Sequence, residues 1–112
     1  MDLSTLTAKA MALRERFSDL ERKNGGREWS KEEVMQGFVG DVGNLMKLVM
    51  AKSGIREVSD VDKKLAHELA DCLWSVLVLA KMYGVEIEKE FLGMIDDVAA
   101  GLAAKKESNQ SP

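Results

Sequence analysis

The chain has 112 residues, of which 46% are hydrophobic and 31% charged, and its formal net charge at pH 7 is −3. These values are typical of one soluble globular domain with a modest core. The negative charge argues against a general DNA or RNA coat, and the absence of a membrane-length apolar stretch or a recognisable signal peptide predicts a cytoplasmic protein without a membrane partner.

Helices dominate the predicted structure, because the only proline is Pro112 and β-branched residues never alternate as they do in strands. The first helix is expected from about Ser4 to Lys23. Asn24-Gly25-Gly26 ends it, since these residues tolerate the left-handed conformation that closes helices. Its apolar residues recur at alternating spacings of three and four and so share one side: Leu3, Leu6, Ala10, Leu13, Phe17 and Leu20.

The second helix has a clear start, because Ser30 and Glu33 match the Ser-x-x-Glu capping box. Trp29 and Val34 can form the hydrophobic staple that accompanies such a box. The helix is expected to end near Ser53-Gly54. Its apolar stripe consists of Phe38, Val42, Leu45 and Val49, and the polar residues Asp41 and Asn44 lie within this apolar run.

The third helix, whose body is residues 65–83, is capped by Ser59 or Asp60 and is apolar nearly all the way round. Cys72 is the only cysteine; we interpret it as a core residue, and a chain that cannot form an internal disulfide suits a reducing compartment. His67 is interpreted as solvated. Tyr83-Gly84 ends the helix.

The fourth helix is expected from about Glu86 to Ala104, with an apolar stripe that includes Phe91, Ile95 and Val98. Asp96 and Asp97 interrupt this stripe and face either solvent or a polar pocket. Residues 105–112 are polar and are predicted to be a disordered tail, which leaves 1–104 as a single helical domain.

Four amphipathic helices with short connections predict an all-α fold, a small four-helix bundle. The third helix is too apolar for one partner face within a chain of this size. We therefore expect a homodimer or a homotetramer built as a dimer of dimers.

Two pairs of polar side chains interrupt the apolar helices at the same spacing. Glu68 and Asp71 are three residues apart, as are Asp41 and Asn44, so each pair lies on one helical face. Carboxylate and amide oxygens from two helices can converge on one hard cation such as Mg²⁺. The alternative is that both pairs simply mark solvated faces.

In this helical order the sequence resembles a known family. Residues 39–45 (Val-Gly-Asp-Val-Gly-Asn-Leu), 68–71 (Glu-Leu-Ala-Asp) and 83–88 (Tyr-Gly-Val-Glu-Ile-Glu) are similar to the MazG-like all-α nucleoside triphosphate pyrophosphohydrolases, in particular the small dCTP-pyrophosphatase-like branch. Family members carry Glu-x-x-Glu on one helix and Glu-x-x-Asp on the next. By position, the resemblance implies that the metal ligands are Asp41, Asn44, Glu68 and Asp71.

The resemblance also implies the chemistry and the partners. Such enzymes use Mg²⁺, with Mn²⁺ as an alternative, to hydrolyse a nucleoside triphosphate or its deoxy form to the monophosphate and pyrophosphate, a housecleaning activity, and they are usually dimers or tetramers. Glu68 and Asp71 would be the catalytic acids. The substrate-binding residues expected are Trp29, Lys47 and Asp97, although the staple alone also accounts for Trp29.

This sequence departs from the family pattern at the metal motif. Asp41 is one methylene shorter than the usual Glu, and Asn44 offers a carbonyl oxygen without a charge. The sequence therefore leaves a second interpretation open: a catalytically impaired family member that binds nucleotide or metal, or serves as a structural oligomeric protein. A third interpretation is a helical oligomerisation module unrelated to nucleotides.

Overall fold

The computed structural model describes residues 2–110, and it describes the side chains of residues 2–106. The described chain consists of helices joined by short loops and contains no strand, which confirms the predicted all-α class. Its elements are α1 (Leu3–Lys23), α2 (Lys31–Lys52), α3 (Val61–Met82) and α4 (Ile87–Gln110). No helix of the described residues combines the length and apolarity needed to cross a membrane.

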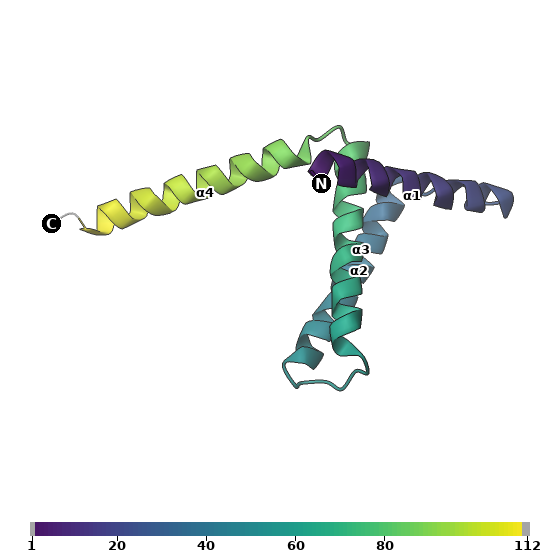
Figure 1. The fold of residues 1–112 in the computed structure, drawn as a ribbon, viewed down its shortest axis with the longest axis horizontal. Coiled ribbons are helices and arrows are strands. Elements are labelled where there is room, and N and C mark those ends of the chain that lie inside the picture. The colour runs from purple at the N-terminus through teal and green to yellow at the C-terminus, as the bar shows by residue number, and fades with distance from the viewer. Residues whose placement is uncertain (1, 111–112) are drawn as a thin grey trace.

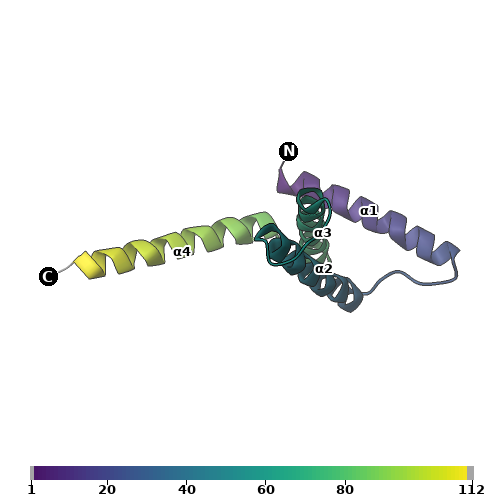
Figure 2. The same cartoon turned by 90° about the horizontal axis from the view of Figure 1, so that it is seen from below.

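The helices form a T rather than a closed four-helix bundle (Figures 1 and 2). α2 and α3 run antiparallel as the stem, and α1 crosses α3 near the C-terminal end of that helix. α4 leads away from the other three helices and approaches α1 only where the two helices begin. The expected bundle is therefore realised by α1, α2 and α3, and α4 extends from it as an arm.

The core lies where α1 crosses the α2–α3 pair. Ala10 of α1, Val34 of α2, and Leu77 and Val78 of α3 form its buried cluster. The indole Nε1 of Trp74 donates a hydrogen bond to the backbone oxygen of Ala10 at 3.2 Å, which ties α3 to α1. The core is small because three helices supply its buried residues and α4 adds only Ile87 at its edge, among the described residues.

Local signals at the helix starts are largely as predicted. Glu33 N–H donates to Ser30 Oγ at 3.2 Å, and Ser30 N–H donates to the Glu33 carboxylate at 3.1 Å, so the capping box of α2 is confirmed. Asp60 holds the N-cap position of α3, but it has a positive φ of 53° and its side chain makes no capping hydrogen bond. α3 is thus held by packing against α2 and α1 rather than by a strong cap.

The link between α3 and α4 sets the direction of the arm. Gly84 has a φ of 68°, a value that glycine adopts without steric cost. Its N–H donates to Lys81 O at 3.1 Å, and Val85 N–H donates to Ala80 O at 2.8 Å. Ile87 then packs against the core cluster. These contacts fix the first turn of α4 and point the rest of the helix away from α2.

α4 continues to Gln110, beyond the predicted end at Ala104. Residues 105–110, which were predicted to be disordered, are therefore helical in the structure, and residues 111–112 lie outside the described part of the chain. The reason is intrinsic propensity: Ala103, Ala104, Lys105 and Lys106 are all strong helix formers. Low hydrophobicity alone is a poor predictor of disorder directly after an established helix.

Candidate metal site

Three carboxylates from two helices converge on one side of the α2–α3 pair. Asp41 comes from α2, and Glu68 and Asp71 come from successive turns of α3. One carboxylate oxygen from each residue lies within 4.8 Å of the others. All three side chains are partly buried, because they flank the contact between the two antiparallel helices.

The electrostatics of this cluster are unfavourable without a cation. Glu68 Oε2 is buried and has no hydrogen-bond partner among the described residues. Burial raises the pKa of Glu68 above its ordinary value of 4.5, and the charges of Asp41 and Asp71 raise it further. Burial, and then the charge of Asp71, likewise raise the pKa of Asp41. Asp41 and Glu68, whose ionisation is disfavoured, and the neighbouring carboxylate of Asp71 form a site that a divalent ion would stabilise.

His67 and Cys72 lie next to the cluster. The His67 Nε2 is 3.2 Å from Asp71 Oδ2, and the imidazole is otherwise exposed, as the sequence predicted. When it is protonated, His67 partly offsets the negative charge and lowers the pKa values of Asp41 and Glu68. Burial, followed by the three neighbouring carboxylates, raises the pKa of the Cys72 thiol, which disfavours a nucleophilic role.

An open hollow of about 530 Å³ adjoins the cluster and shares Glu68 with it. Asn44, predicted as a fourth ligand, is exposed and borders this hollow together with Glu68. Lys47 borders it too, together with two lysines from the first turn of α3, Lys63 and Lys64. This hollow, here called the lysine hollow, is therefore bordered by three lysines, together with Asp60 and Glu68, beside the cluster of acids.

Trp29 lies in a different place, in an apolar pocket of about 350 Å³ between α1 and the stem. Phe17 and Trp74 also line it, and their rings meet edge to face with centroids 6.2 Å apart. Val34 borders the same pocket, which agrees with the predicted staple. Arg14 lines it as well: one guanidinium nitrogen donates to Trp29 O at 2.8 Å, and Nε is buried without a partner.

The aromatic pocket and the carboxylates lie on the same side of the stem. Val34 precedes Asp41 by seven residues, so the two share one face of α2 and are about 10 Å apart along its axis. On α3, Trp74 follows Asp71 by three residues, or one turn. The lysine hollow lies beyond the acids in the opposite direction, so aromatic rings, carboxylates and lysines follow one another along the stem.

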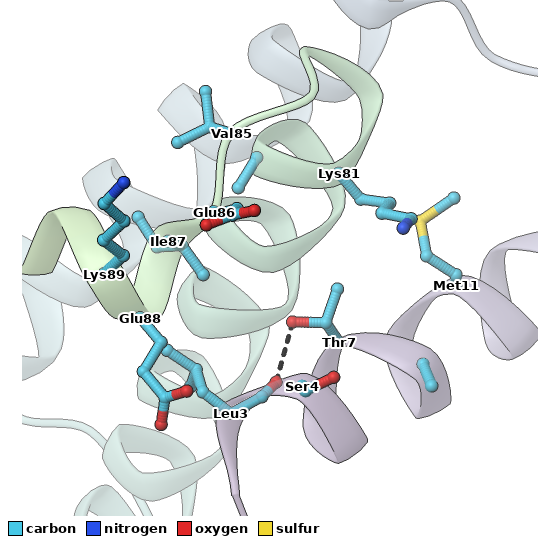
Figure 3. Close-up of a pocket in the computed structure, with 12 residues that line it drawn as sticks. Leu3, Ser4, Thr7, Met11, Lys81, Val85, Glu86, Ile87, Glu88 and Lys89 are labelled. Carbon is cyan, nitrogen blue, oxygen red and sulfur yellow. Dashed lines mark hydrogen bonds between the residues drawn. The ribbon is translucent and has the colours of Figure 1, made fainter.

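Asp97 is not brought to this region within the described chain. It lies on the exposed arm α4, which leads away from the stem (Figure 1). A third pocket, of about 490 Å³, lies between the start of α1 and the α3–α4 link and contains none of the predicted site residues (Figure 3). There Thr7 Oγ1 donates to Leu3 O at 2.8 Å within α1.

Three residues that line these pockets are not among the site residues predicted from the sequence: Arg14, Lys63 and Lys64. The two lysines carried a usable signal, because they precede His67 and Glu68 by one helical turn and must share their face. Arg14 carried none, since it lies simply outside the apolar stripe of its helix. No family model, no curated protein and no solved structure matches the chain.

Proposed function

We propose that the chain is a Mg²⁺-dependent nucleoside triphosphate pyrophosphohydrolase, which converts a nucleoside triphosphate or its deoxy form to the monophosphate and pyrophosphate. The observation that carries the proposal is the convergence of Asp41, Glu68 and Asp71, with oxygens within 4.8 Å of one another, beside a hollow lined by lysines. The proposal includes Mn²⁺ as an alternative metal and the cytoplasm as the compartment.

The residues present fit a hard divalent cation. Carboxylate oxygens are the ligands that Mg²⁺ prefers, and Glu68 Oε2 has no hydrogen-bond donor of its own within the described chain. Asp41, Glu68 and Asp71 would hold the ion, and Asn44 would approach it from the edge of the hollow. When bound, the cation would neutralise phosphate charge and favour attack by water.

The substrate would lie along the stem. The rings of Trp29, Phe17 and Trp74 offer an apolar pocket for a planar base, since aromatic rings stack on bases of any identity. The distance of about 10 Å along α2 between Val34 and Asp41 leaves room for a sugar between base and phosphates. In this pose the β- and γ-phosphates would reach the lysine hollow.

The reaction would then proceed by displacement at the α-phosphorus. A carboxylate of Glu68 or Asp71 would accept a hydrogen bond from the attacking water, orient its oxygen, and take up its proton as the new bond to the α-phosphorus forms. The bond from the α-phosphorus to the bridging oxygen breaks, and pyrophosphate leaves with that oxygen. Lys47, Lys63 and Lys64 would stabilise the charge on the departing pyrophosphate.

A second candidate function is nucleotide or metal binding without turnover. The uncharged side chain of Asn44 favours this second candidate. It leaves three carboxylates in the site where the family pattern has four acids. The two candidates differ in what substitution of Asn44 does. An enzyme should lose activity in Asn44→Ala if Asn44 is a ligand, whereas a degenerate site should gain activity in Asn44→Glu.

The test of the proposed function is pyrophosphate release from a panel of ordinary and modified nucleoside triphosphates with Mg²⁺ or Mn²⁺. We expect release by the natural chain, with nucleoside monophosphate as the second product, and none by Asp71→Ala. Asp96→Ala, which removes an exposed acid from α4, is the matched control and should retain activity. Release of orthophosphate instead, or release that survives Asp71→Ala, would refute the proposal.

A further inference from the structure

The arm α4 carries an apolar stripe that nothing in the described part of its own chain covers. Phe91, Ile95, Val98 and Leu102 are spaced by four, three and four residues, so they share one side of the helix. Each is between 47% and 62% exposed. Beyond Ile87, the described side chains of α4 are all exposed. Most of the stability of a helix in a protein comes from packing of its amphipathic face, so this stripe calls for a partner.

A second uncovered apolar surface, here called the open face, lies on the stem. Its α2 residues repeat at the same alternating spacing of four and three: Met35, Val39, Val42, Met46 and Val49. Its α3 residues are Leu69 and Leu73. All seven are between 43% and 60% exposed.

The open face lies on the side of the stem opposite the lysine hollow. The buried residues of α2, Val34 and Leu48, mark the side of that helix that faces α3. At 3.6 residues per turn, Val42 in the middle of the open-face stripe is rotated about the axis of α2 by roughly 100° from that side. Asn44 and Lys47, which border the lysine hollow, are rotated the other way. Opposite rotations place the hollow and the open face on opposite sides, so a partner on the open face leaves the hollow accessible.

The amount of surface left exposed matches what a stable homodimer buries. The chain exposes 8503 Å², whereas a compact monomer of its mass should expose about 6100 Å². The excess, roughly 2400 Å² per chain, is of the size that each partner contributes to an obligate homodimer. The radius of gyration of 18.8 Å likewise exceeds the value of about 13 Å expected for a compact chain of this length.

Within one chain, the arm α4 is held away from the open face of that chain. The hydrogen bonds of Gly84 and Val85 to the end of α3, and the packing of Ile87 on the core, direct α4 away from α2 (Figure 1). The arm of a second copy has no such constraint. Its length also matches, because α4 spans about 36 Å and α2 and α3 about 33 Å each at 1.5 Å per residue.

We propose that two copies of the chain exchange their arms, so that α4 of each copy packs along the open face of the other. Charges favour an arm antiparallel to the α2 it covers. α4 begins with Glu88 and Glu90 and carries Lys105 and Lys106 near its end, whereas α2 begins with Glu32 and Glu33 and ends with Lys52. The antiparallel arrangement brings the basic end of the arm to the acidic end of α2. This proposal names the surfaces of the expected oligomer and does not depend on the nucleotide chemistry.

The test is the mass of the full-length chain in solution, measured by sedimentation velocity over a range of concentrations. We expect twice the 12.4 kDa of one chain, or four times if dimers pair. Val98→Asp places a carboxylate in the proposed contact and should raise the dissociation constant of the dimer at least about 100-fold, since a buried unpaired charge is costly. Ala100→Asp places the same charge on the opposite side of α4 and should leave the assembly intact.

A second pair of variants separates arm exchange from direct contact between two open faces. Val42→Asp on the open face and Val98→Lys on the arm should each dissociate the dimer, and an equimolar mixture should associate again through the new opposite charges. Circular dichroism checks that each variant is folded. The proposal is overturned if the natural chain is a monomer, if Val98→Asp still forms dimers, or if the mixture does not associate while both variants are helical.

Discussion

Removing one charge from the carboxylate cluster should stabilise the metal-free protein. In Glu68→Gln the amide replaces a partly buried carboxylate whose Oε2 has no hydrogen-bond partner in the described chain. One of its oxygens lies within 4.8 Å of an oxygen of each of two other acids. The new amide N–H₂ can donate to Asp41 or Asp71, whereas the original carboxylate can only repel them. The substitution changes charge with almost no change in volume, so packing stays nearly constant.

The expected magnitude follows from the distances. Two unit charges 4.8 Å apart repel by about 0.9 kcal/mol in water and about 3.5 kcal/mol at an effective dielectric constant of 20. At pH 7 the penalty at Glu68 cannot exceed about 3.4 kcal/mol, because at 1.36 kcal/mol per pH unit above its ordinary pKa of 4.5 the folded chain would take up a proton instead. A gain of about 1–3 kcal/mol corresponds to a melting temperature higher by roughly 4–12 °C in a domain of this size.

The dependence on pH distinguishes this mechanism from a packing effect. The folded pKa of Glu68 is raised, so the folded state binds more protons than the unfolded state in the range above 4.5, and stability falls as the pH rises through that range. The advantage of Glu68→Gln should therefore vanish below pH 4.5 and grow towards neutrality. Added Mg²⁺ should reverse the order, because only the natural cluster gains from the ion.

The assay is thermal unfolding followed by circular dichroism between pH 4 and 8, in chelator and in Mg²⁺, at one protein concentration. Glu57→Gln, which removes an exposed carboxylate from the α2–α3 loop, is the control and should shift the midpoint by no more than about 2 °C. A Glu68→Gln protein that is less stable than the natural chain at pH 7 without metal, or whose advantage does not change with pH, would refute the reasoning.

Three further predictions concern the core, a cap and the aromatic pocket. Val78→Ala should cost about 2 kcal/mol in urea denaturation, because Val78 is fully buried; a cost below about 0.5 kcal/mol would contradict its central place. Ser30→Ala should lower the free energy of unfolding by about 1 kcal/mol through loss of the capping box, whereas Ser30→Thr should retain most of the stability that the box provides. Equal losses of stability in the two variants would contradict this account. Trp29→Ala should raise KM for the nucleotide about tenfold with kcat within twofold; an unchanged KM would exclude base contact.

The helices themselves could be predicted from the sequence because each depends on local signals. The capping box at Ser30, the apolar spacing of α1, and the glycines after each of the first three helices are read within a few residues. The predicted end of α4 at Ala104 is wrong, because a polar segment does not become disordered where Ala103 to Lys106 favour a helix. Local propensity was the better guide there.

The site was predictable only where helical periodicity decides which residues share a face. Glu68 and Asp71 are fixed by their spacing, and Asp41 meets them because α2 and α3 are antiparallel neighbours. Asn44 shares a face with Asp41 but is rotated outward, so it borders the hollow instead. The direction of α4, and with it the distance of Asp97 from the cluster, depends on the turn at Gly84 and on the docking of Ile87. No spacing rule specifies either contact.

The most direct test of the account is whether the three carboxylates bind one divalent cation. Mn²⁺ can be titrated into the metal-free protein and its free concentration followed by electron paramagnetic resonance. We predict one bound ion per chain, displaced by Mg²⁺, lost in Asp71→Ala and retained in Asp96→Ala. No saturable binding by the natural chain, or binding that is unchanged in Asp71→Ala, would contradict the account, because the cluster of Asp41, Glu68 and Asp71 would then hold no metal.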